Sequence, residues 1–279
     1  MPSYDPTSLD PSFFEAIGGT EPFVEPTYSS WDGAQHGPQP RPDWVVTDFA
    51  AVDTELGILK TGKEADVHLV QRAVPGGRSC LLAAKRYRTS DHRLFHRDAS
   101  YTEGRSTRRT RDVRAMEGRT GYGKRLLAGQ WAFAEFDALD RLWSAGAPVP
   151  YPVQLLDTEL MLEFIGEPDG TAAPRLAQYR PDRDELADLY AQCVDAMVLL
   201  ARSGFAHGDL SAYNLLVHHG TLVMIDVPQI VDMFSNPQGP EFLERDCANV
   251  CSWFARRGLA AADPDRLFGD LMAEAVARW

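Results

Sequence analysis

The chain has 279 residues and a formal net charge of -12, with 44% hydrophobic and 24% charged residues. This composition is typical of a soluble globular protein with one large domain or two lobes. The negative charge argues against general nucleic-acid binding, and no apolar run approaches the length of a membrane span. Because the N-terminus is polar and acidic, unlike a signal peptide, we expect a cytoplasmic protein with no membrane segment.

The charge is distributed unevenly along the chain. Residues 85–125 hold 13 Lys plus Arg against 5 Asp plus Glu, a local charge of +8, so the other residues carry about -20. Such a basic segment is either a solvated loop or a docking surface for phosphate, RNA or an acidic partner. The sequence leaves these alternatives open.

The N-terminal part of the chain predicts a tail followed by a group of strands. Residues 1–45 are rich in Pro, Gly, Ser and acidic residues, which indicates a flexible tail with regular structure beginning near Trp44. Residues 56–70 are typical of a strand, a tight turn and a second strand. A third strand, Cys80–Tyr87, carries Lys85 at the position of the lysine in the V-A-I-K motif of protein kinases. We therefore expect Lys85 to contact nucleotide phosphates.

A helix is predicted from about Leu127 to Ala145, ended by Gly146. Glu135 lies on the apolar stripe formed by its neighbours Trp131 and Leu139. A buried carboxylate without a cation is costly, so we predict an ion pair with Lys85, as protein kinases require. The alternative is that Glu135 lies in water at the edge of the stripe.

The next segments predict a connector and three helices. Glu159–Gly166 is typical of a strand that continues into the hinge where a kinase offers backbone groups to adenine. A long amphipathic helix is predicted from Asp182 to Ser203, ended by Gly204. Residues 241–257 and 263–278 are the remaining helical candidates.

The most informative motif is residues 207–229. His-Gly-Asp-Leu-Ser-Ala-Tyr-Asn is similar to the kinase catalytic loop H-R-D-L-x-x-x-N, with Gly208 in place of the arginine. In that pattern Asp209 orients the attacking hydroxyl and Asn214 binds a divalent metal. Asp226 follows the apolar run 221–225, where a second metal-binding carboxylate is expected. The alternative, that these residues only form turns, requires both halves of the motif to be coincidental.

Over residues 56–259 the chain resembles the RIO family of atypical serine protein kinases. The resemblance rests on Thr-Gly-Lys-Glu-Ala at 61–65, on the Lys85 strand, on Trp131-Ala with Glu135-Phe, on the catalytic loop, on Ile-Asp-Val-Pro-Gln at 225–229 and on Arg-Asp-Cys-Ala-Asn at 245–249. It implies ATP binding by Gly62, Lys63, Glu64, Lys85, Glu135, Glu163 and Ile165; catalysis by Asp209 and Asp226; metal binding by Asn214 and Asp226; and supporting roles for His207, Ser211 and Asp246.

The resemblance also implies a fold and an activity. The expected fold is α+β and kinase-like, with a β-rich small lobe at 46–165 and a helical large lobe at 166–279, and without the activation loop and substrate-binding helices of larger kinases. The basic segment would supply a flexible loop at about 90–126. The implied activity uses ATP with Mg²⁺ or Mn²⁺ and phosphorylates a protein serine, including the chain's own. ATPase activity through a phosphorylated Asp226 and a link to ribosome maturation, with ribosomal RNA bound through residues 85–125, are implied as well.

Two other function classes remain open. Small-molecule kinases of the aminoglycoside or choline type also use His-Gly-Asp and a downstream Ile-Asp, but the short chain after Asp226 leaves little room for their helical lobe. A nucleotide-dependent switch with little turnover is the other alternative. The presence of Lys85, Asp209, Asn214 and Asp226 favours catalysis over that reading.

Overall fold

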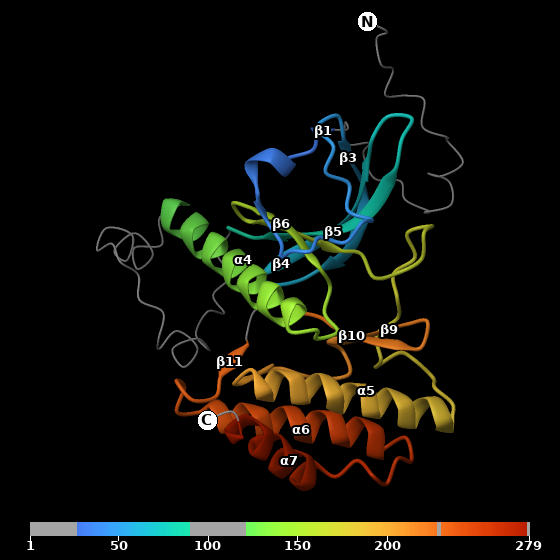
Figure 1. Cartoon of the computed structure of the whole chain (residues 1–279), viewed down its shortest axis with the longest axis vertical. Helices are drawn as coiled ribbons and strands as arrows, with labels where there is room; N and C mark the ends of the chain where they lie inside the picture. Colours follow the sequence, from blue (N-terminus) through green and yellow to red (C-terminus); the bar gives the residue numbers. More distant parts are fainter. Residues whose placement is uncertain (1–26, 90–120, 228–229, 278–279) are drawn as a thin grey trace, which may run out of the picture. The chain divides into compact units, whose positions relative to one another are not determined.

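The computed structural model describes residues 27–89, 121–227 and 230–277. Among the described residues, 27–88 and 152–172 form a first compact unit, and 89, 121–151, 173–227 and 230–277 form a second. The first unit is built on a sheet and the second mainly on helices, so the expected α+β, kinase-like fold is confirmed (Figure 1). The units differ from the predicted lobes in two places, since residues 121–151 group with the helical unit and residues 166–172 with the sheet unit.

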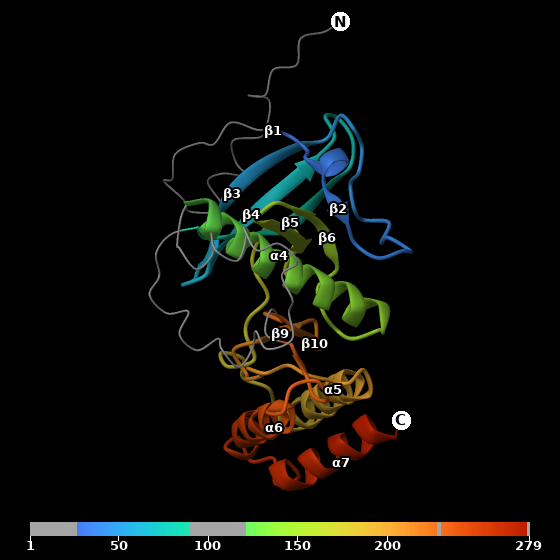
Figure 2. The ribbon, with the colours of Figure 1, turned by 90° about the vertical axis from the view of Figure 1, so that its left-hand side faces the viewer.

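The sheet of the first unit has seven strands in the order β1-β3-β4-β5-β7-β6-β2. Its centre is the predicted series of strands, β3 (Val52–Thr61), β4 (Ala65–Ala73) and β5 (Ser79–Tyr87), all antiparallel. β7 (Glu159–Glu163) pairs with β5, and β6 (Pro152–Leu156) pairs with β7. The long strands β3 and β4 lie side by side across this sheet in Figure 2.

The N-terminal segment closes both edges of this sheet. β1 (Thr27–Tyr28) pairs with β3 and β2 (Gln35–His36) pairs with β6, while the short helix η2 (Trp31–Gly33) lies between them. Since only residues 29–34 separate the two edge strands, the sheet has to curl. The buried Trp31 ring stacks on His36 with 3.7 Å between the ring centroids.

The expectation that regular structure begins near Trp44 is therefore wrong. The Pro-rich composition correctly indicates a segment with no core of its own. Residues 27–45 nevertheless gain structure from the edges of the sheet, through backbone pairing and the burial of Trp31 and Val45. The part of the predicted tail at 1–26 lies outside the described residues.

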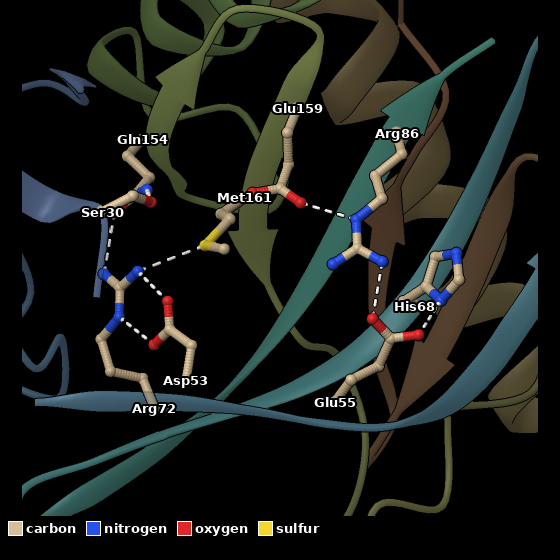
Figure 3. Close-up of polar contacts among 9 residues, drawn as sticks. All are labelled: Ser30, Asp53, Glu55, His68, Arg72, Arg86, Gln154, Glu159 and Met161. Atoms are coloured by element: carbon tan, nitrogen blue, oxygen red, sulfur yellow. Dashed lines mark hydrogen bonds and ion pairs between the residues drawn. The ribbon is translucent and has the colours of Figure 1, made fainter. Parts of the chain in front are cut away.

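Two charged networks lie on one face of the sheet (Figure 3). In the buried network, Arg72 donates to both carboxylate oxygens of Asp53, at 2.7 and 2.9 Å, and to Gln154 Oε1 at 2.8 Å. Gln154 in turn donates to Ser30 Oγ at 2.8 Å, which connects the N-terminal segment to the centre of the sheet. The second network is more exposed and joins Arg86 to Glu55 and Glu159, each at 2.6 Å, and Glu55 to His68.

The second unit contains α4 (Gly121–Ser144), α5 (Arg183–Arg202), α6 (Gly239–Ala255) and α7 (Pro264–Val276). α7 packs against both α5 and α6 (Figure 2). The predicted limits of α5 are confirmed, because Asp182 caps its first amides and Gly204, at φ 82°, follows its end.

The helices bear on two smaller points. α4 begins before Leu127, so residues 121–126 are helical rather than part of the predicted basic loop, whose residues 90–120 lie outside the described residues. Where the chain is described, no helix combines the length and hydrophobicity that a membrane crossing requires.

Candidate active site

The predicted phosphate loop is the tight turn between β3 and β4. Gly62 N–H donates to the Ala65 carbonyl at 3.0 Å, and a Cβ on Gly62 would lie 2.8 Å from that oxygen. The turn therefore requires glycine at this position. Lys63 and Glu64 are exposed at its tip, where a long cationic side chain can reach a phosphate group.

Arg88 ties this loop to the strand that carries Lys85. Its backbone N–H donates to the Glu64 carbonyl at 2.8 Å, and its guanidinium binds both carboxylate oxygens of Asp66. The hydrogen bonds and charge of Arg88 hold the pKa of the Asp66 carboxyl below its usual range. Arg88 at the end of β5 thus holds the loop at Glu64 and the start of β4 at Asp66.

Lys85 projects from the opposite face of β5 to Arg86, because neighbouring side chains alternate along a strand. Its Nζ lies 5.5 Å from the centroid of the Tyr87 ring. In the sheet Lys85 is paired with Leu160 of β7, and β7 continues to Glu163 and the connector residue Ile165. The same unit thus places Lys85 and Glu163 on adjacent strands, with Ile165 two residues beyond the end of β7.

The connector turns back immediately after Ile165. Gly166 pairs with Ala172, and a Cβ on Gly166 would lie 2.3 Å from the Thr171 carbonyl and 2.7 Å from the Phe164 ring. Glycine is required there, so the direction of the chain after Ile165 is set by close packing.

In the second unit a hairpin places the two predicted metal ligands together. β9 (Leu215–His218) and β10 (Thr221–Met224) are joined by His219 and Gly220, both at positive φ, 50° and 75°, as in a type I′ turn. A two-residue turn fixes the register, so Met224 pairs with Leu215. The next pair is Ile225, whose N–H donates to the Asn214 carbonyl at 2.9 Å.

Asn214 and Asp226 consequently leave the same end of this hairpin. The Asn214 amide nitrogen donates to the Asp209 carbonyl at 2.9 Å, which orients the side chain and leaves Oδ1 as the atom that could bind the predicted metal. Asp226 adopts φ 64°, a left-handed conformation that costs about 1 kcal/mol outside glycine. An amide oxygen and a carboxylate are the ligands that Mg²⁺ and Mn²⁺ prefer, so these residues fit a divalent metal.

Asp209 is exposed between two buried neighbours, Gly208 and Leu210. His207 is buried behind it and links the two halves of the motif, since Asp209 N–H donates to His207 Nδ1 at 3.4 Å. His207 Nε2 in turn donates to the Ile225 carbonyl at 3.2 Å. The supporting role predicted for His207 is consistent with these contacts.

Asp246 reaches this loop from α6. Its two carboxylate oxygens accept from the N–H groups of Gly208 at 2.8 Å and Leu210 at 2.7 Å. Burial raises the pKa of the Asp246 carboxyl, although His207 and the two backbone donors act in the opposite direction. The third predicted supporting residue, Ser211, accepts the Asn214 N–H with its carbonyl at 2.9 Å.

Glu135 is 1% exposed on α4, so the alternative that it lies in water is wrong. Lys85 belongs to the first unit and Glu135 to the second, and their ion pair stays a prediction. The motif at 245–249 contains Arg245 and Asn249, but the sequence predicted no role for these two residues or for Arg88, all of which bind backbone groups of the two predicted loops. Backbone carbonyls carry no residue-specific signal, so only the i, i+1, i+4 spacing of polar residues at 245, 246 and 249 on α6 could have indicated them.

Comparison with known proteins identifies relatives along most of the chain. The family model for the RIO domain matches residues 77–267. The RIO-type serine/threonine-protein kinase Rio1 of Haloferax volcanii is 37% identical over 218 residues, which cover 78% of this chain and 68% of that relative. The human serine/threonine-protein kinase RIO1 is 34% identical over 217 residues, 77% of this chain and 36% of the relative. The Saccharomyces cerevisiae serine/threonine-protein kinase RIO1 is 30% identical over 246 residues, which cover 80% of this chain and 48% of that relative. The chain thus spans less than half the length of these eukaryotic relatives.

Proposed function

Because the chain belongs to the RIO family, we propose that it is a serine/threonine protein kinase that transfers the γ-phosphoryl group of ATP to a serine of a protein, including its own. Membership of this kinase family implies ATP and a divalent metal; Mg²⁺ or Mn²⁺ is our finer proposal. The relatives named as protein kinases support a protein acceptor over a small alcohol and turnover over a silent switch.

The proposed step is an in-line displacement at the γ-phosphorus. The serine oxygen forms a bond to phosphorus, the bond to the β,γ-bridging oxygen breaks, and ADP leaves with that oxygen. The Asp209 carboxylate accepts the serine proton, for which its exposed position beside a rigid backbone is suitable. A divalent cation held by Asn214 Oδ1 and Asp226 would supply charge neutralisation on the phosphate oxygens.

The first unit would bind the nucleotide. The exposed Lys63 and the Lys85 side chain provide two cations for phosphate oxygens, and the backbone of Glu163 and Ile165 would receive adenine. The observation that carries the proposal is the hairpin register, which brings Asn214 and Asp226 to one end of β9 and β10.

The experiment is transfer from γ-labelled ATP by the purified full chain, measured on the chain itself and on added protein acceptors with Mg²⁺ or Mn²⁺. Asp209→Asn and Asp226→Asn should each lower turnover by about 100-fold or more, while Lys85→Ala should mainly raise the KM for ATP. Asp195→Asn, an exposed carboxylate on α5, is the matched control and should be unaffected. Label transfer that survives both aspartate substitutions, or that reaches only small alcohols, would refute the proposal.

Two further roles follow from the family resemblance and are proposed with it. ATP hydrolysis through a phosphorylated Asp226 is supported by the left-handed, partly exposed Asp226. It is tested by protein-bound label that hydroxylamine releases, as expected of an acyl phosphate, and that disappears in Asp226→Asn. Binding of ribosomal RNA through residues 85–125 is supported only by their charge, because 90–120 lie outside the described residues. Affinity for ribosomal RNA should then fall steeply as salt rises, and salt-independent binding would contradict it.

A further inference from the structure

The two residues on either side of Asp209 have all of their backbone hydrogen-bonding groups held by one helix. Asp246 of α6 accepts the N–H groups of Gly208 and Leu210. The two carbonyls of the same residues are bound by other side chains of α6: the Arg245 guanidinium donates to the Gly208 carbonyl, and Asn249 Nδ2 donates to the Leu210 carbonyl at 3.2 Å.

These four contacts fall on four consecutive peptide planes. A residue's N–H belongs to the peptide plane before it and its carbonyl to the plane after it. The Gly208 contacts therefore hold the planes 207–208 and 208–209, and the Leu210 contacts hold the planes 209–210 and 210–211. Because only φ and ψ connect successive planes, the contacts together fix the backbone of Asp209 and the direction of its Cα–Cβ bond.

The backbone at this position needs such support. Gly208 has φ 86°, a region that glycine enters easily and leaves easily, so the peptide plane 208–209 has little intrinsic preference. That plane contains the Asp209 N–H, which contacts His207 only weakly at 3.4 Å. Among the described contacts, the Arg245 bond to the Gly208 carbonyl is the stronger constraint on this plane.

The side chains that hold the loop are themselves well positioned. α6 buries its other face through Leu243, Cys247 and Phe254, so the helix is anchored independently of the loop. The Arg245 guanidinium carbon lies 4.8 Å from the centroid of the Phe242 ring, one turn earlier on the helix. Arg245, Asp246 and Asn249 share one side of α6 at the i, i+1, i+4 spacing.

We propose that Arg245 and Asn249 are positioning residues, which hold the carbonyls flanking Asp209 and so aim its carboxylate at the acceptor hydroxyl. The proposal rests on the proposed function, since it assigns them a role in the proton transfer made by Asp209. Neither residue touches a substrate in this scheme. Their effect is on the rate of the chemical step, and binding of the nucleotide does not depend on them.

The test compares Asn249→Ala and Arg245→Met with Ser252→Ala, an exposed position on the same helix. Turnover should fall about 10- to 100-fold in both positioning variants, because displacements of about 1 Å at a reacting group have effects of that size. The KM for ATP should change less than about twofold, and Ser252→Ala should match the wild type. A kcat within about twofold of wild type in both variants would overturn the proposal.

A second measurement separates positioning from loss of fold. In an Asp209→Asn background, Asn249→Ala should have no further effect on the residual rate, because it acts only through the Asp209 carboxylate. An equal fold loss in both backgrounds would mean a general structural role and would refute the proposal.

Amide hydrogen exchange tests the same contacts without any assay of activity. Residues 208–211 should exchange faster in Asn249→Ala and in Arg245→Met, and as in wild type in Ser252→Ala. Unchanged exchange in both positioning variants would refute the clamp itself. The two proposals can also fail separately. If the positioning variants exchange faster but the wild-type chain transfers no phosphate, the proposed function is refuted while the contacts of α6 with the loop stand.

Discussion

The buried Arg72 network makes a sharp prediction about the stability of the first unit. Arg72 is 0% exposed and its partner Asp53 is 9% exposed, so both charges depend on each other and on Gln154 rather than on water. Replacing Arg72 with methionine keeps much of the side-chain volume but removes three hydrogen bonds to these partners. The Asp53 carboxylate is then left buried without a cation.

The expected loss follows from the geometry of this pair. Removing one partner of a buried, bidentate ion pair costs about 3–5 kcal/mol, and the unsatisfied Gln154 oxygen places the expected value near the middle of that range, at about 4 kcal/mol. Arg86→Met is the matched control, because Arg86 lies on the same face of the sheet and binds two carboxylates but is 39% exposed. Partly exposed pairs of this kind contribute about 1 kcal/mol or less.

The assay is unfolding in urea, monitored by the hydrogen exchange of backbone amides in β3, β4 and β5. These strands report on the first unit alone. The slope of the free energy of unfolding against urea should be unchanged, so that the midpoint measures stability. The double variant Asp53→Leu with Arg72→Met should recover at least about 2 kcal/mol, because no charge remains buried. An Arg72→Met variant no less stable than Arg86→Met would refute the reasoning.

Three other predictions concern the two loops. Gly62→Ala should raise the KM for ATP several-fold in the transfer assay with little change in kcat, because the added Cβ would lie 2.8 Å from the Ala65 carbonyl oxygen. An unchanged KM would argue against this turn as the phosphate loop. Arg88 lowers the pKa of the Asp66 carboxyl in the folded chain. The ionised Asp66 therefore stabilises the fold fully at pH values above its pKa in the unfolded chain, about 3.9, and this stabilisation is lost as the pH falls through its lower pKa in the folded chain. Acid unfolding of the first unit should therefore begin at higher pH in Arg88→Met than in wild type, and coincident curves would contradict the assignment. Gly220→Val should destabilise the hairpin by about 1–2 kcal/mol, because Gly220 has φ 75°, a conformation that valine adopts only with strain. It should also lower kcat, and full activity would show that the turn does not determine the positions of Asn214 and Asp226.

Local patterns were sufficient where the determinants of structure are local. The cap at Asp182 and the glycine at 204 give the limits of α5, and alternation with turn residues gives β3, β4 and β5. The ordered motif at 207–226 likewise pointed to Asp209, Asn214 and Asp226, whereas the hairpin of β9 and β10 that joins them comes from the structure.

Other features depend on contacts that composition cannot express. Residues 27–45 are structured because they pair with strands at 52–53 and 154–155, and those edges are not visible in a Pro-rich segment. The roles of Arg245 and Asn249 depend on carbonyls about forty residues away along the chain, which any sequence can supply. The start of α4 was placed too late because its first turn contains Gly121 and Gly123, and glycine is a weak helix former.

The closure of the sheet by the N-terminal segment has a consequence for synthesis of the chain. β2 is synthesised early, but its partner β6 is translated only after α4. Gln35 therefore cannot pair with Leu155 until about 120 more residues have been added. Until then the outer strand of the growing sheet offers unpaired backbone groups to other chains. Such long-range pairing is slow to form, so a nascent chain paused before β6 should be the species most in need of a chaperone.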